Sequence, residues 1–245
     1  MVGKVDYDET RLAYITAWLP GRLDRLYVDY TGIPVRKGDH MVKLYSPELL
    51  GAQQELLQAL QAVRELKSSD VAIVRETTQA TVEAARDKLR LWGLTAEQVA
   101  EIEKLGKPSD HTTIYAPMGG IVIRKEAQQG MYVDTGTRIY TIADLSKVWV
   151  KLDAYESDLM WLRYGQQVAF TTEAYPGETF AGRIAFIDPV LDDMMRTIKV
   201  RVNVDNADGR LKPGMFVRGV VKANVAAAGK VMDPDLAGKW MCPMH

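Results

Sequence analysis

The sequence contains a single cysteine, Cys242, so no disulfide can form within the chain. Its 31 basic and 32 acidic side chains nearly cancel, which gives no reason to expect nucleic acid as a partner. No apolar run approaches the about 18 residues that a membrane span requires. The first residues also lack the charged and apolar regions of a signal peptide, so we expect any leader or anchor to lie outside this sequence.

Residue patterns typical of catalysis or phosphate binding are also missing from the sequence. Two acidic clusters, Glu156–Asp158 and Asp192–Asp193, lie where loops or helix starts are expected, and solvation accounts for them. His40 and His111 are isolated histidines, which are usually surface or capping residues. We therefore expect a protein that is not an enzyme and needs no cofactor.

An internal repeat is the most informative feature that the sequence does contain. Seven glycine and apolar positions recur 98 residues later without a gap, namely Gly21, Leu23, Gly32, Val35, Gly38, Met41 and Leu44, matched by Gly119, Ile121, Gly130, Val133, Gly136, Ile139 and Ile142. The glycines end short apolar runs, as expected of tight turns between strands. Each copy is therefore predicted to be a small β-meander, and two such halves resemble the flattened sandwich of biotinyl and lipoyl carrier domains.

The junction between the two copies argues against a carrier. A carrier domain needs a lysine on a tight hairpin between its halves, because the amine becomes acylated. Here a long helical insertion separates the copies instead, beginning at Ser46-Pro47-Glu48 with an N-cap hydroxyl, a proline and an acidic first turn.

The insertion has the periodicity of two amphipathic helices and a short third one. One apolar stripe contains Leu49, Ala52, Leu56, Leu60 and Val63, and another contains Val71, Val74, Thr78, Val82, Ala85, Leu89 and Trp92. Thr95 and Gln98 have capping-box spacing, and Gly106 is expected to end the third helix. We expect an antiparallel hairpin that folds back into a compact bundle.

The rest of the chain has the alternation of β-strands. Residues 2–18 read as one strand leading into the first repeat, and five further strands follow the second repeat, covering 148–154, 167–172, 180–187, 197–203 and 215–222. Together these segments would close a small barrel.

The predicted fold class is mainly β, with an inserted α-helical hairpin or bundle, in an elongated multi-domain arrangement of a lipoyl-like sandwich and a small barrel. The domain boundaries that we predict are 1–16 with 145–224 for the barrel, 17–45 with 112–144 for the sandwich, 46–111 for the helices, and 225–245 for a linker and tail.

Several segments resemble the CusB-like branch of the periplasmic adaptors, also called membrane fusion proteins, of RND-type efflux pumps. These segments are Leu44-Tyr45-Ser46-Pro47-Glu48-Leu49, Leu91-Trp92-Gly93-Leu94, Tyr115-Ala116-Pro117-Met118-Gly119-Gly120 and Leu211-Lys212-Pro213-Gly214-Met215. The Thr-Arg-Thr turn that this branch often has is matched only by Arg196 and Thr197. The methionine-rich N-terminal copper ligands of some members are absent, so that metal site is not carried over.

The resemblance implies a periplasmic protein associated with the inner membrane that works through binding surfaces. Its expected partners are an inner-membrane RND transporter, an outer-membrane channel and further copies of itself, with six as the expected number. The exported cation would be Cu(I) or Ag(I). The turn Lys67, Ser68, Ser69 and Asp70 would contact the channel if the hairpin points outward.

The C-terminal tail holds one candidate metal site, made of Met241, Cys242, Met244 and His245. Thiolate and thioether sulfurs favour Cu(I) or Ag(I), and cysteine with histidine also suits Zn(II). The tail resembles the start of a small heavy-metal-binding module that this sequence does not complete, and a tail that binds nothing tightly is the alternative. Met194-Met195 is a weaker thioether pair, for which packing is the simpler explanation.

Two other functions are alternatives to the adaptor. One is a biotinyl or lipoyl carrier subunit, and the other is a free-standing periplasmic metal chaperone.

Overall fold

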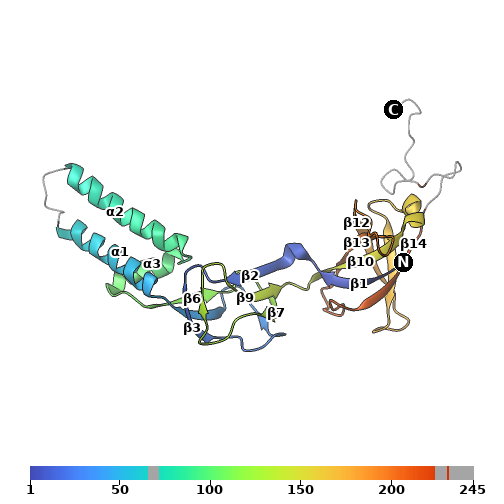
Figure 1. Cartoon of the computed structure of the whole chain (residues 1–245), viewed down its shortest axis with the longest axis horizontal. Helices are drawn as coiled ribbons and strands as arrows, with labels where there is room; N and C mark the ends of the chain where they lie inside the picture. Colours follow the sequence, from blue (N-terminus) through green and yellow to red (C-terminus); the bar gives the residue numbers. More distant parts are fainter. Residues whose placement is uncertain (66–71, 224–230, 232–245) are drawn as a thin grey trace, which may run out of the picture. The chain divides into compact units, whose positions relative to one another are not determined.

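The computed structural model describes residues 1–65, 72–223 and 231, and it divides into two compact units. The barrel unit joins Met1–Leu12 to the chain from Ala143 onward, and the sandwich-helix unit comprises Ala13–Ile142. Figure 1 shows the elements of each unit with their labels.

The barrel unit is a closed six-stranded barrel with strand order β1-β10-β13-β12-β11-β14. Its strands are β1 Val2–Tyr7, β10 Lys147–Tyr155, β11 Gln167–Thr172, β12 Phe180–Ile187, β13 Thr197–Asp205 and β14 Phe216–Val221. Inward-facing apolar side chains alternate with outward-facing polar ones, and Val150, Leu152, Val200 and Val202 are fully buried. The predicted closure of an N-terminal strand with five later strands is confirmed.

The chain leaves the barrel earlier than the sequence predicted. The segment read as one strand is divided into β1, a 3₁₀ turn at Glu9–Arg11 and β2 at Leu12–Thr16. The Asp8 carboxylate causes the break, because it accepts hydrogen bonds from the backbone N and the Oγ1 of Thr10 at 3.0 and 2.6 Å. Strand β2 consequently pairs in a sheet of the sandwich, whereas the prediction had assigned it to the barrel.

The sandwich consists of two four-stranded sheets, in the orders β2-β9-β7-β4 and β6-β5-β3-β8. Strands β2 to β5 precede the helices and β6 to β9 follow them, so each sheet takes two strands from each half of the sandwich. The bounds of the strands not yet given are β3 Gly21–Leu26, β4 Pro34–Val35, β5 His40–Tyr45, β6 His111–Tyr115, β7 Gly120–Lys125, β8 Tyr132–Val133 and β9 Arg138–Ala143.

Glycines at matching positions of the two copies donate similar hydrogen bonds to the opposite copy, although their acceptors are 99 and not 98 positions apart. Gly32 and Gly130 both have positive φ, 90° and 83°, which glycine adopts without strain. The backbone N of Gly130 donates to the carbonyl of Leu23 at 2.7 Å, and that of Gly32 donates to the carbonyl of Val122 at 2.8 Å. The repeat in the sequence is therefore an approximate twofold symmetry in the sandwich.

Three helices lie between β5 and β6, namely α1 Pro47–Glu65, α2 Ala72–Leu91 and α3 Ala96–Leu105. Helix α1 begins where predicted, and the Ser46 hydroxyl accepts a hydrogen bond from the backbone N of Leu49 at 3.4 Å. The capping box of Thr95 and Gln98 is formed, and Gly106 ends α3 in the left-handed region.

Helices α1 and α2 form the predicted hairpin, with α3 against α2 (Figure 1). Leu49, Leu56 and Leu89 are fully buried within an apolar core that also includes residues of the sandwich. The guanidinium of Arg86 on α2 donates to both carboxylate oxygens of Glu103 on α3 at 2.7 and 3.0 Å. This pairing raises the pKa of Arg86, and it fixes α3 to the hairpin. The predicted fold class, mainly β with inserted helices, is confirmed.

Candidate functional site

The helices are attached to the sandwich through two short adjacent stretches of chain, Tyr45–Ser46 and Ser109–His111. We call these stretches, together with the side chains that bind them, the neck. Tyr45 ends β5 and His111 begins β6, and the two residues are paired across these antiparallel strands. The backbone N of Ser46 donates to the carbonyl of Asp110 at 3.0 Å. Both connections between sandwich and helices therefore lie side by side.

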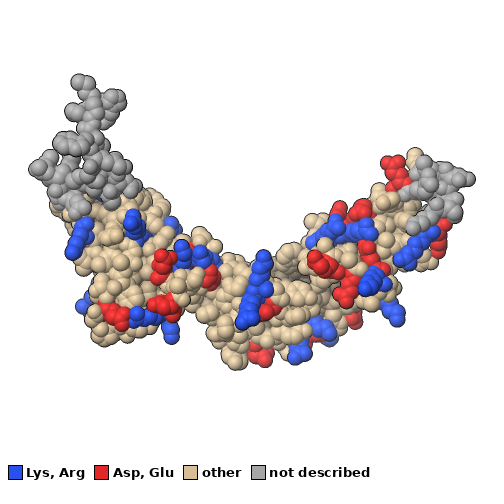
Figure 2. Space-filling model, turned by 180° about the vertical axis from the view of Figure 1, so that it is seen from behind, with Lys and Arg blue, Asp and Glu red and all other residues tan. Residues whose placement is uncertain are grey.

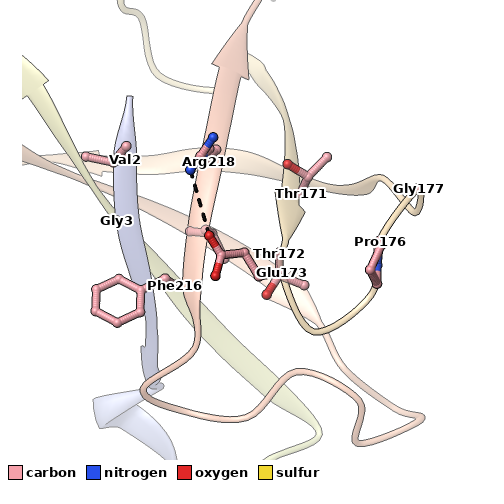
Figure 3. A pocket seen from close by; sticks show the side chains of 10 residues that line it. Val2, Gly3, Thr171, Thr172, Glu173, Pro176, Gly177, Phe216 and Arg218 are labelled. Atoms are coloured by element: carbon pink, nitrogen blue, oxygen red, sulfur yellow. Dashed lines mark ion pairs between the residues drawn. The ribbon is translucent and has the colours of Figure 1, made fainter.

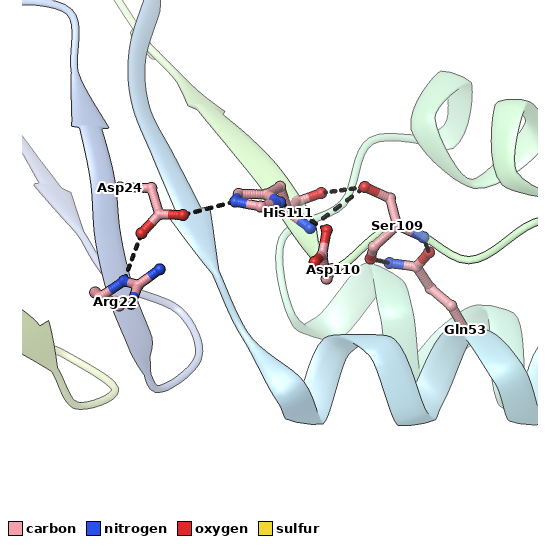
Figure 4. Close-up of polar contacts among 6 residues, drawn as sticks. All are labelled: Arg22, Asp24, Gln53, Ser109, Asp110 and His111. Atoms are coloured by element: carbon pink, nitrogen blue, oxygen red, sulfur yellow. Dashed lines mark hydrogen bonds and ion pairs between the residues drawn. The ribbon is translucent and has the colours of Figure 1, made fainter. Parts of the chain in front are cut away.

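A glutamine on α1 closes the neck on the helical side (Figure 4). The Gln53 side chain is 1% exposed, and its amide bonds the backbone of Ser109 in both directions. Its Nε2 donates to the Ser109 carbonyl at 2.9 Å, and its Oε1 accepts from the Ser109 N at 2.7 Å. Because a buried amide is costly without partners, this pairing specifies where α1 lies against the returning chain.

A histidine between two carboxylates closes the neck on the sandwich side (Figure 4). The Nε2 of His111 lies 2.7 Å from the carboxylate of Asp24 on β3, and its Nδ1 lies 2.6 Å from that of Asp110. The Arg22 guanidinium donates to the other oxygen of Asp24 at 2.6 Å. The hydrogen bonds from Arg22 and then from His111 lower the pKa of Asp24 to about 2.

Sequence reasoning missed this cluster, because it treated His111 as an isolated residue. Asp24 and His111 are 87 positions apart, and no local pattern connects them. His40, the other histidine considered, packs between the rings of Tyr27 and Tyr115 at centroid distances of 5.8 and 5.1 Å.

A further contact between the helices and the sandwich depends on a glycine between α2 and α3. Gly93 has φ of 85°, and a Cβ placed on it would lie 2.3 Å from the indole ring of Trp18. The missing side chain therefore lets Trp18, which follows β2, lie directly against the turn between the two helices.

The barrel unit carries an open groove of about 490 Å³ on its outer surface (Figure 3). Val2 on β1 and Phe216 on β14 line it, and both are largely exposed, at 60% and 66%. Glu173 and Arg218 form an ion pair at 3.7 Å across the same surface. Exposed apolar side chains beside a groove are typical of a protein-binding surface.

The residues predicted to bind metal or the channel are not placed by the structure. Met241, Cys242, Met244 and His245 lie outside the described residues, as do Lys67, Ser68, Ser69 and Asp70. The two loop methionines are described, and Met194 and Met195 are 96% and 58% exposed. They are therefore not packed in the barrel core, contrary to the packing role that the sequence favoured.

Three further properties of the described residues concern charge, metal ligands and hydropathy. In Figure 2 basic and acidic side chains lie interspersed on the side that is drawn. Within residues 1–65, 72–223 and 231, no three His, Cys, Asp or Glu side chains are grouped so that they could hold a metal ion. None of the described helices is long and apolar enough to cross a membrane.

Comparison with models of known families shows to which family the chain belongs. The family model described as the CusB barrel-sandwich hybrid domain matches residues 12–143, which is more than half of the chain. The model described as the CusB-like beta-barrel domain matches residues 147–225. The chain belongs to the CusB-like family. The resemblance on which the sequence analysis relied is thereby confirmed.

Individual relatives agree with this CusB-like assignment. The chain is 28% identical to the cation efflux system protein CusB of Escherichia coli (strain K12), over 95% of the chain and 54% of that protein. It is 27% identical to the putative membrane fusion protein SilB of Salmonella typhimurium, over 95% and 51%. The crystal structure of ZneB from Cupriavidus metallidurans is similar with a TM-score of 0.57 and 27% identity, over 90% of the chain and 69% of that structure. The chain spans about half the length of the curated relatives that it matches.

Proposed function

We propose that this chain is the periplasmic adaptor of an RND-type tripartite pump that exports heavy-metal cations, with Cu(I) and Ag(I) as the cations. In this role it bridges an inner-membrane transporter and an outer-membrane channel. Several copies, six in our proposal, assemble around the transporter. The protein is not an enzyme, and it acts through the surfaces that it presents.

One observation carries this proposal. The sandwich has the interleaved halves of a carrier domain, but β5 and β6 are joined through three helices, where a carrier has a hairpin with its modified lysine. A helical hairpin fixed to the sandwich by Gln53 and by the cluster around His111 suits a spacer that transmits position between two partners. The barrel is then the surface for the transporter, and the turn Lys67–Asp70 is the surface for the channel.

The tail residues Met241, Cys242, Met244 and His245 are proposed as a sensor or delivery element for the exported cation. Soft sulfur ligands and an imidazole within five residues are the support for this role. Titration of Cu(I) into the chain and into a Cys242→Ser, His245→Ala variant tests it. Equal affinity for both proteins would remove the tail from the mechanism.

Gene deletion in the host tests the adaptor role itself. We expect the deletion strain to lose resistance to silver and copper, and the wild-type gene to restore it. A variant in which a short Gly-Ser linker replaces residues 46–110 keeps both halves of the sandwich and should fail to restore resistance. Circular dichroism and the level of the variant in the periplasm show whether it folds, and full resistance with a folded variant would overturn the spacer role.

Two measurements distinguish the alternatives. A stoichiometric lipoyl or biotinyl adduct, detected by intact mass after expression with the ligating enzymes, would support the carrier. Resistance that persists when the transporter gene is deleted would support the metal chaperone.

A further inference from the structure

A row of cations crosses the outer surface of the barrel unit at one register position. Lys4 on β1 is paired with Lys151 on β10, which is paired with Arg201 on β13. Phe216 on β14 lies beside Lys4 at one end of the row, and Phe186 on β12 lies beside Arg201 at the other. Like charges directly opposite one another on neighbouring strands are destabilising, so this arrangement requires an explanation.

The same five strands have an excess of positive charge on their outward-facing positions. We call this surface the cationic face and define it as the outward side chains of β14, β1, β10, β13 and β12. Seven are basic, namely Lys4, Lys147, Lys151, Arg183, Lys199, Arg201 and Arg218, and three are acidic, namely Asp6, Asp153 and Asp205. The whole chain has a net charge of −1, so positive charge is concentrated here.

Four of these seven cations already form ion pairs with neighbouring carboxylates. The Nζ of Lys151 lies 2.8 Å from the carboxylate of Asp6 and 3.0 Å from that of Glu9. Lys199 pairs with Asp153 at 2.5 Å. Lys147 pairs with Asp205 at 3.4 Å, and Arg218 pairs with Glu173 at 3.7 Å. These side chains have little capacity left for a partner, so they do not explain the row.

Arg201 is different, because it is held in place by rings and not by a carboxylate. Its guanidinium carbon lies 4.2 Å from the ring centroid of Trp149 and 5.2 Å from that of Phe186. Its Nε is buried and has no hydrogen-bond partner, and within the described part of the chain Arg201 forms no ion pair. Because this Nε is buried, a partner's carboxylate would have to bind the guanidinium through its two Nη groups, which form no hydrogen bond within the described residues.

We propose that the cationic face binds an acidic surface of a partner protein, and that Arg201 is its anchor for a carboxylate. Arginine stacked on aromatic rings presents a rigid planar fork that fits one carboxylate, and Arg and Trp are enriched among the residues that dominate binding energy. The surface extends toward β14 through Lys4 and the exposed Phe216. Lys4 also lacks an ion pair within the described residues. A lipid surface would need mobile exposed cations, whereas Arg201 is half-buried and oriented.

The partner that we assign is the inner-membrane transporter, and this choice rests on the proposed function. The test measures binding of the full chain to the transporter encoded beside its gene, in detergent, by surface plasmon resonance. Arg201→Gln should weaken binding by about 30-fold, the loss expected for a dominant interface residue. Arg201→Lys keeps the charge but loses the fork, so most of the affinity should also be lost.

Arg210 provides a matched control in the same unit. Its guanidinium carbon lies 4.3 Å from the ring centroid of Tyr175 and 5.5 Å from that of Phe180, but its charge is satisfied by Glu178 at 2.6 Å. Arg210→Gln should leave the affinity within twofold of wild type. Equal thermal unfolding of the Arg201 and Arg210 variants shows that a difference in binding is not a folding defect.

The outcomes separate the inference from the proposed function. If the wild-type chain does not bind the transporter, the adaptor role fails. If it binds and Arg201→Gln binds equally well, the adaptor role stands and the anchor is refuted. Binding to phosphatidylglycerol vesicles that depends on Arg201, with unchanged transporter binding, would also refute it and would assign the cationic face to the membrane.

Discussion

Asp24 leads to a specific prediction about the acid stability of the sandwich-helix unit. Arg22 and His111 hold the pKa of its carboxyl at about 2, compared with 3.8 for the unperturbed group. Because the pKa is lowered in the folded state, ionised Asp24 contributes stability above pH 4, and this contribution is lost as the pH falls toward 2. Nearly two pKa units correspond to at most about 2.4 kcal/mol.

The expected effect is smaller than this limit, because the Asp24 side chain remains 23% exposed to solvent. Screening by water reduces the stability contributed by such pairs, and we expect about 1 kcal/mol. The substitution Asp24→Asn keeps the shape of the side chain and removes its charge. The variant should therefore unfold about 1 kcal/mol more easily than wild type at pH 5.5, and the difference should fall by more than half at pH 2.5.

The appropriate assay is urea unfolding in which hydrogen exchange, detected by mass spectrometry, monitors each peptide. Peptides from β3 and β6 report the sandwich separately from the barrel, so unfolding of the other unit does not obscure the result. Glu101→Gln on the exposed surface of α3 is the matched control and should behave as wild type at both pH values. A stability difference for Asp24→Asn that is the same at pH 5.5 and 2.5 would refute the charge-based account of the neck.

Four further substitutions, two of them controls, test contacts of the same unit with the same assay. Gln53→Ala leaves the two backbone groups of its partner unpaired and should cost about 1 to 3 kcal/mol, whereas Gln61→Ala, on the exposed surface of the same helix, should cost less than about 0.5 kcal/mol. Gly93→Ala would force a Cβ against Trp18 at a positive φ and should cost more than about 1 kcal/mol. Gly51→Ala, which meets nothing within 4 Å, should instead stabilise the unit by about 0.5 to 1 kcal/mol. Equal effects of the two alanines at glycine positions would contradict the close approach of Gly93 to Trp18.

The sandwich could be predicted from the sequence because the same pattern of glycine and apolar residues occurs in both of its halves. Glycines 98 positions apart mark the same turns, and a residue with φ near 90° is restricted to glycine in practice. The helix boundaries were predictable for a similar reason, since caps such as Thr95 with Gln98 are local patterns. One local signal was overlooked at Asp8-Glu9-Thr10. The alternation of apolar and polar residues was read as one strand across this segment, although the Asp8 side chain forms a turn there.

The neck and the cationic face could not be predicted in this way. Each depends on side chains that only the topology brings together, such as Asp24 with His111, or Arg201 with Trp149 and Phe186. The register of β10, β13 and β12 decides whether an arginine lies between two rings, and a bulge at Ile184/Phe186 shifts that register. Alternation identifies outward-facing residues, but it does not identify their neighbours on other strands.

The way the helices join the sandwich has a mechanical consequence for the proposed spacer. Strand β5 continues into α1, strand β6 receives the chain from α3, and the two strands are paired from His40–Tyr115 to Tyr45–His111. Because β5 also pairs with β3, a rotation of the hairpin relative to the sandwich would break ladder hydrogen bonds or the polar contacts of Gln53 and His111. The neck is therefore the part of the sandwich-helix unit that limits rotation of the hairpin relative to the sandwich. Substitutions in the neck should impair coupling between the hairpin and the sandwich more than substitutions within α1 or α2 that cost the same stability.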